Sequence, residues 1–98
     1  MKVRILTSAF NDLSDGREFY DQQGEGLGDY FFDSVFSDID SLALYGGIHL
    51  KVSGYHRYLA SRFPYAIYYR MGSSGEVIVY RVLDCRQDPA KTRMALMR

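Results

Sequence analysis

The sequence predicts an α+β domain of element order β-α-α-β-β-β, with two N-terminal helices packed on a mainly antiparallel four-stranded sheet. Apolar residues recur at helical spacing over 27–42, and two runs rich in aromatic and β-branched residues, 65–71 and 76–82, flank a short Gly/Ser turn. A chain of 98 residues can bury one core. We therefore expect one domain over 1–98, with 90–98 as a short C-terminal tail.

The chain opens with a short predicted strand over 2–7, where Val3, Ile5 and Leu6 cluster. A helix follows, with Ser8 or Asn11 as a candidate N-cap. Gly16 lies inside this helix and costs about 1 kcal/mol relative to alanine. The helix is therefore expected to be weak in isolation.

The second helix has the most regular pattern in the chain. Its apolar positions fall on one face: Leu27, Phe31, Val35, Ile39 and Leu42. Most of its acidic residues keep to the other faces, as in an amphipathic helix that covers a core. Gly46-Gly47 is the predicted end.

Three strands are predicted after the helices. Residues 53–61 alternate in polarity, and 65–71 and 76–82 read as a β-hairpin. The last run is apolar on both faces, with Val77 and Val79 set against Ile78 and Val82, which predicts a position inside the sheet. Pro64 is expected to mark the start of its strand, where a missing N–H is tolerated.

Charge divides the chain into halves. Residues 1–50 hold three Lys or Arg against nine Asp or Glu, a net −6, and residues 51–98 hold nine against three, a net +6. One interpretation is a basic face for nucleic acid or an acidic partner, and the other is attraction between acidic helices and a basic sheet within the monomer.

Several classes of protein are disfavoured. No apolar run is long enough to span a membrane, and charges interrupt the N-terminal apolar stretch, so no signal peptide or membrane partner is expected. The single Cys85 fits a reducing cytoplasm. Only two histidines are present and no strand precedes the glycines of 24–28, so neither a metal site nor a cofactor loop is predicted.

Three stretches together resemble the RelE/ParE superfamily, the toxins of bacterial type II toxin–antitoxin modules, often called plasmid stabilisation proteins. They are GLGDYF at 26–31, RFPYAIYYR at 62–70 and VLDCRQDP at 82–89. The resemblance covers about residues 2–89. It implies a toxin that a cognate antitoxin wraps and neutralises, as a homodimer or in a toxin–antitoxin hetero-oligomer. ParE-like relatives poison DNA gyrase, whereas RelE-like relatives cut mRNA within the ribosome.

The resemblance carries over to a ribonuclease site only in part. Cleavage through a ribose 2′-hydroxyl needs a proton acceptor, a proton donor and cations. Arg57 and Arg86 match basic positions of the family, and His56 or Tyr65 are candidate bases, so these four are the weak catalytic candidates. The departures are Ala66 for a strand arginine of the ribonuclease members, Asp84 for a histidine, Gln87 for a second arginine often found in ParE-like relatives, and Thr92 for a tail aromatic residue.

The preferred prediction is therefore a ParE-like toxin that inhibits growth by binding an essential target such as DNA gyrase. A ribosome-dependent mRNA endoribonuclease and a non-toxic relative that only binds a partner are the alternatives. The target-binding candidates are Arg57, Arg62, Arg81 and Arg86. Arg62 and Arg70 have a second reading as cations that protect strand ends from aggregation. Cys85 is expected to be a small buried apolar residue rather than a reactive thiol.

Overall fold

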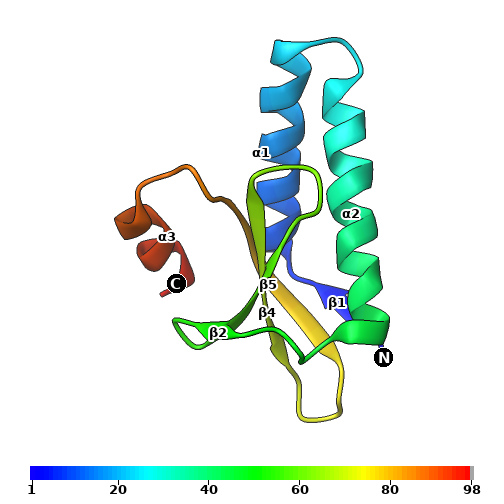
Figure 1. The fold of residues 1–98 in the computed structure, drawn as a ribbon, viewed down its shortest axis with the longest axis vertical. Coiled ribbons are helices and arrows are strands. Elements are labelled where there is room, and N and C mark those ends of the chain that lie inside the picture. The colour runs from blue at the N-terminus through cyan, green and yellow to red at the C-terminus, as the bar shows by residue number, and fades with distance from the viewer. Residues whose placement is uncertain (98) are drawn as a thin grey trace.

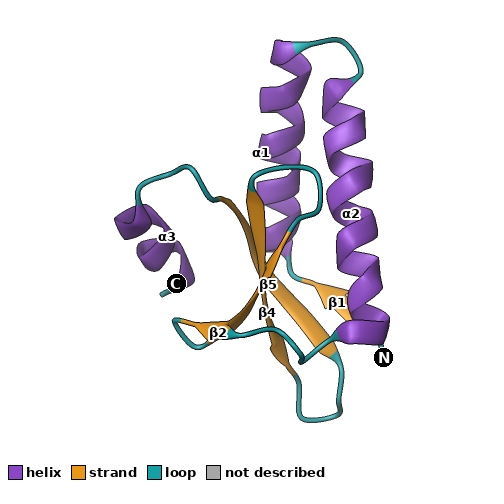
Figure 2. Cartoon of the chain, viewed as in Figure 1, coloured by secondary structure: helices purple, strands orange, loops and turns teal. Residues whose placement is uncertain are grey.

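The computed structural model describes residues 1–97 and holds two long helices side by side against a twisted sheet, with a short third helix on the far side of that sheet (Figure 1). In chain order the elements are β1 (Val3–Ile5), α1 (Thr7–Gln23), α2 (Leu27–Tyr45), β2 (Lys51–Val52), β3 (Tyr55–Leu59), β4 (Tyr65–Met71), β5 (Val77–Asp84) and α3 (Pro89–Leu96). We call the face of the sheet that packs on α1 and α2 the inner face, and the opposite one, which α3 partly covers, the outer face (Figure 2).

The sheet has five strands in the order β1-β5-β4-β3-β2. Only the β1–β5 pair is parallel, so the predicted α+β class and the mainly antiparallel sheet are confirmed. The predicted count of four strands is wrong. A tight turn at Ser53 and Gly54, both with positive φ, folds Lys51 and Val52 back onto the start of β3 as a fifth strand.

Strand β5 lies between β1 and β4, as its apolar faces predicted. Its register, however, changes within the strand, because Tyr68 pairs with Arg81 whereas Tyr69 pairs with Val79. This bulge shifts the alternation, and Val82 joins Val79 in the inner core instead of facing away from it. The predicted placement of Val82 beside Ile78 is therefore wrong.

The helices build the main core with the inner face. Its buried members are Ala9, Leu13, Tyr20, Phe31, Val35, Ile39, Leu42, Tyr65, Ile67, Tyr69, Val77, Val79 and Val82. Gly16 faces Phe31 so closely that an added Cβ would lie 2.5 Å from the ring. The glycine that weakens α1 is thus what allows α1 and α2 to approach each other.

The start of α1 differs from its prediction. The helix begins at Thr7 after Leu6, and neither predicted residue caps it. The Ser8 hydroxyl instead donates to the Tyr80 carbonyl oxygen at 2.7 Å, which ties the first turn of α1 to β5. The other predicted boundaries agree: Gly46 follows α2, and Pro64 directly precedes β4.

The C-terminal part of the chain is helical over Pro89–Leu96. Asp88 caps α3 by accepting a hydrogen bond from the Ala90 N–H at 2.9 Å, and Pro89 occupies its first turn. Leu96 packs with Tyr55, Ala66, Tyr68 and Leu83 in a second, smaller cluster on the outer face. Over residues 1–97, the helices are all too short or too polar to cross a bilayer.

Candidate functional site

The candidate functional site is a pocket of about 270 Å³ between the outer face and α3. Its floor is formed by Arg57 of β3, Tyr68 of β4 and Cys85, which follows β5, and its wall by Arg93 and Leu96 of α3. The strand register places Arg57 directly opposite Tyr68. The pocket therefore joins two cations to a phenol and a thiol that lie far apart in the sequence.

Arg57 is positioned by its neighbours. Its Nε donates to the Tyr68 hydroxyl at 3.2 Å, and its Nη2 lies 3.5 Å from the Cys85 Sγ. The hydrogen bond to Tyr68 raises the pKa of Arg57 above its usual value, so the group stays a cation at any physiological pH. A fixed guanidinium of this kind suits a phosphate or a carboxylate.

Cys85 is exposed, so the prediction of a buried apolar cysteine is wrong. The chain leaves β5 at Asp84, and the Cys85 N–H then donates to the Pro64 carbonyl oxygen at 2.8 Å. This bond leaves the side chain at the rim of the sheet, facing Arg57 rather than the core.

Helix α3 holds the second side of the pocket. The Tyr55 hydroxyl donates to the Leu96 carbonyl oxygen at 3.0 Å, and the Gln87 amide donates to the Thr92 hydroxyl at 3.1 Å. Gln87 and Thr92, two of the four departures from the family pattern, therefore bond to each other. Arg93 was not predicted as a site residue, although the Asp88-Pro89 helix start signals a helix that would carry it beside Leu96.

Arg81 and Arg86, two of the target-binding candidates, are held in ion pairs. Arg81 donates to both carboxylate oxygens of Asp12, at 2.8 and 2.9 Å, and its side chain is only 24% exposed. Arg86 pairs with Asp84 at 2.8 Å and thereby lowers the pKa of that carboxyl. The Arg81–Asp12 pair is an attraction between the two charged halves of the chain.

The two candidate bases lie elsewhere. His56 stacks on Tyr69 on the inner face, and its Nδ1 bonds to the His49 carbonyl oxygen at 2.6 Å. Tyr65 belongs to the inner core, and burial raises its pKa to about 12, so its phenol stays protonated at neutral pH. The structure therefore does not bring the four catalytic candidates together.

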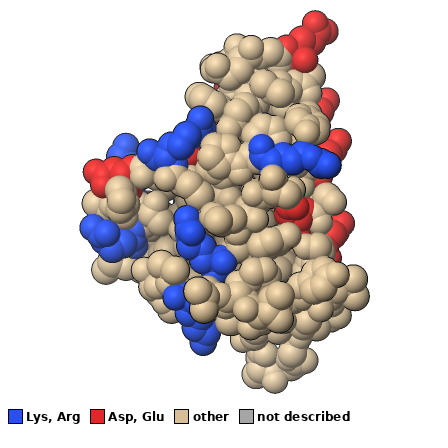
Figure 3. Space-filling view, viewed as in Figure 1, with Lys and Arg blue, Asp and Glu red and all other residues tan. Residues whose placement is uncertain are grey.

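Arg70 extends the positive charge over the outer face, where it stacks on Tyr55 of the smaller cluster. The Arg70 guanidinium lies 4.0 Å from the centroid of the Tyr55 ring, and Arg62 is exposed just before β4. Figure 3 shows basic side chains over α3 and the adjoining sheet, and acidic ones along the edge formed by α2. The candidate site lies within this basic region.

Comparison with solved structures identifies the fold. The chain is similar to a chain of the chromosomal ParDE toxin–antitoxin system from P. aeruginosa, with a TM-score of 0.66 and 17% sequence identity over 84% of this chain and 92% of that one. No protein-family model and no curated protein matched the sequence. The likeness confirms the ParE-like fold that the three motifs predicted.

Proposed function

We propose that this protein is the toxin of a type II toxin–antitoxin module, which inhibits growth by binding an essential target and is neutralised by a cognate antitoxin. The fold shared with a ParDE chain supports this class. The outer-face pocket supports binding of an acidic group of that target, because the side chains of Arg57 and Arg93 and the Tyr68 hydroxyl line it together. DNA gyrase is the proposed target, and the protein acts in the cytoplasm.

Expression without antitoxin tests this proposal. Induction of the full chain in a bacterium is expected to arrest growth and induce the SOS response while translated mRNA stays intact. The purified protein is expected to inhibit supercoiling by gyrase. Normal growth at high levels of folded protein would contradict the proposal and favour the non-toxic partner-binding relative.

Two variants locate the activity. Arg57→Ala combined with Arg93→Ala removes both pocket cations, and growth arrest is expected to disappear. Arg57→Ala combined with Arg86→Ala tests the pair chosen from sequence. Lys2→Ala, which removes an exposed charge next to β1, is the control and is expected to leave growth arrest intact.

The second candidate function is ribosome-dependent cleavage of mRNA. The observation that favours it is the position of Arg57 and the Tyr68 hydroxyl together on the outer face, where a phosphodiester could lie between them and Arg93. Primer extension on translated transcripts separates the two functions, because cuts within codons, abolished by Tyr68→Phe, would assign the protein to this class.

A further inference from the structure

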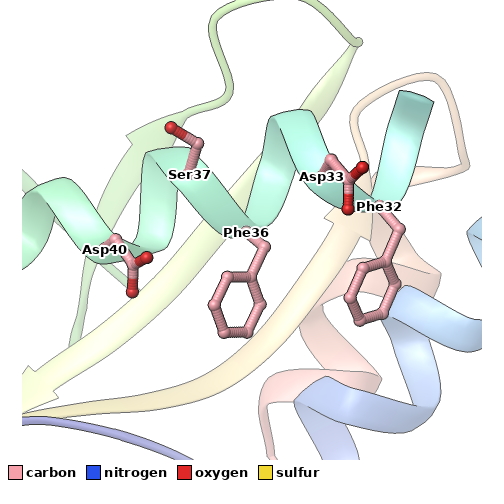
Figure 4. A pocket seen from close by; sticks show the side chains of 5 residues that line it. All are labelled: Phe32, Asp33, Phe36, Ser37 and Asp40. Carbon is pink, nitrogen blue, oxygen red and sulfur yellow. The ribbon is translucent and has the colours of Figure 1, made fainter. Parts of the chain in front are cut away.

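Helix α2 presents a second surface, which we call the α2 surface and define by Phe32, Asp33, Phe36 and Asp40. These residues line a shallow groove of about 230 Å³, seen in Figure 4 with both phenyl rings on one side of the helix. Between Leu27 and Tyr45 the helix carries no lysine or arginine, so its charge is entirely negative.

The aromatic part of this surface is only partly covered by the protein. The Phe32 and Phe36 rings stack with centroids 6.0 Å apart and planes 12° apart. The apolar character continues along the end of α2 and the loop after it, where Leu44 is 77% and Ile48 73% exposed. Exposed large apolar side chains gathered at one end of a helix are typical of interaction surfaces.

The Phe32 end of the surface already binds an arginine. The Arg17 guanidinium of α1 lies 5.5 Å from the Phe32 ring centroid and forms an ion pair with Asp29. A cation thus rests on an aromatic face while a carboxylate one turn away neutralises it. This contact within the protein shows that a phenyl ring with a neighbouring carboxylate binds an arginine side chain.

The combination of an aromatic ring and a nearby carboxylate recurs at Phe36, but no arginine in the described part of the chain is paired with it. Asp33 and Asp40 lie three residues before and four residues after Phe36, on neighbouring turns of the same helix side. The ion pairs among residues 1–97 include neither of these two carboxylates. The second aromatic face and its two acids are therefore available to an arginine from another molecule.

We propose that the α2 surface binds an amphipathic segment of a partner protein that places an arginine on Phe36, between Asp33 and Asp40, and apolar side chains toward Phe32 and Leu44. From Phe32 to Leu44 the helix rises about 18 Å, which matches a partner segment of about twelve helical residues. On the proposed function, this partner is the antitoxin. The outer face then binds the target, and the α2 surface binds the neutralising protein.

A labelled peptide tests the proposal with the full-length protein. The probe is an 18-residue helical peptide with a leucine face and one central arginine, compared by fluorescence anisotropy with versions that carry lysine or glutamate instead. The arginine peptide is expected to bind most tightly, the lysine peptide several-fold more weakly because ammonium stacks less well, and the glutamate peptide least. Equal binding of the three peptides, or no binding of the arginine peptide, would overturn the proposal.

Matched variants locate the binding. The double variant Asp33→Asn with Asp40→Asn removes two exposed charges. Its affinity for the arginine peptide is expected to be at least tenfold lower than that of the wild-type protein. Glu18→Gln with Glu25→Gln removes two exposed charges elsewhere and is expected to change affinity less than twofold. All four positions are exposed, so both variants should fold, which circular dichroism verifies. Equal losses in both variants would reject the assigned site.

Light scattering tests whether a second copy of this protein binds the α2 surface. A second copy is a candidate because the outer face of this chain also carries arginines. A wild-type dimer that Asp33→Asn with Asp40→Asn dissociates would assign the surface to self-association and overturn the proposal. Growth arrest separates the two proposals. The Asn variant is expected to remain toxic, whereas a harmless wild-type chain that still binds the arginine peptide would contradict the proposed function alone.

Discussion

The two faces of the sheet differ in how they are covered. The inner face packs against two long helices, and its core holds Phe31, Ile67 and Tyr69 with no exposed surface. The outer face is covered by the eight-residue α3, which contributes one buried side chain, Leu96, and leaves arginines beside a pocket. Apolar burial on one face thus stabilises the fold, and sparse cover on the other leaves charged groups accessible.

The largest expected loss of stability comes from a substitution in the core of the inner face. Phe31→Ala removes a ring that contacts Tyr20, Phe63 and Tyr65, and it leaves a cavity that the helices cannot fill. We expect the free energy of unfolding in urea to fall by about 3–5 kcal/mol. A loss below 1 kcal/mol would show that the inner core does not carry the stability of the domain.

The second-largest effect on stability is expected at the Arg81–Asp12 ion pair, which joins β5 to α1. Asp12→Ala leaves the Arg81 guanidinium and the Val82 N–H without the acceptor that now serves both. We expect a loss of about 2–3 kcal/mol in unfolding free energy. Glu18→Ala, at an exposed position of the same helix, is the control and should change stability by less than about 0.5 kcal/mol.

A smaller effect is expected from the outer face. Leu96→Ala removes the apolar anchor of α3, so the helix should detach before the domain unfolds. Hydrogen exchange is expected to rise selectively in residues 89–96, while the urea midpoint falls less than for Phe31→Ala. Uniform exchange across the chain would mean that α3 unfolds only together with the inner core.

The smallest effect is pH-dependent and lies at the loop after α2. Desolvation, with a smaller contribution from His56, lowers the pKa of His49, whose Nδ1 bonds to the Tyr69 hydroxyl. The fold prefers the neutral imidazole, so this contribution is present above the unfolded pKa of about 6.5 and is lost as pH falls below it. Urea unfolding at pH 7.5 and 5.5 should show a loss on acidification that His49→Gln reduces; an equal loss in the variant would contradict this origin.

Local patterns in the sequence were sufficient to predict the two long helices and four of the five strands. The apolar period of α2, the hairpin of β4 and β5 and the position of Pro64 follow from spacing within each segment, and they are as predicted. The helix-first order also predicted that the helices cover one face of the sheet. These features depend on contacts between near neighbours in the chain, which a sequence displays directly.

The candidate site could be predicted only in part. Arg57 was identified from sequence, but its partners Tyr68, Cys85 and Arg93 come from β4, the β5 exit and α3. Likewise, alternation alone could not place Val82, because the bulge near Tyr80 becomes visible only when β4 and β5 are paired.

The sequence by itself determined the two long helices, four of the five strands, their order, the fold class and the division of charge, because each follows from residue type and short-range spacing. The tertiary structure decided which charges meet. It joined Arg81 to Asp12 across the domain, separated His56 and Tyr65 from Arg57, and left Asp33 and Asp40 beside an open aromatic ring. Pairing across long separations depends on strand register and helix docking, and these are set by packing of the whole core rather than by any one segment.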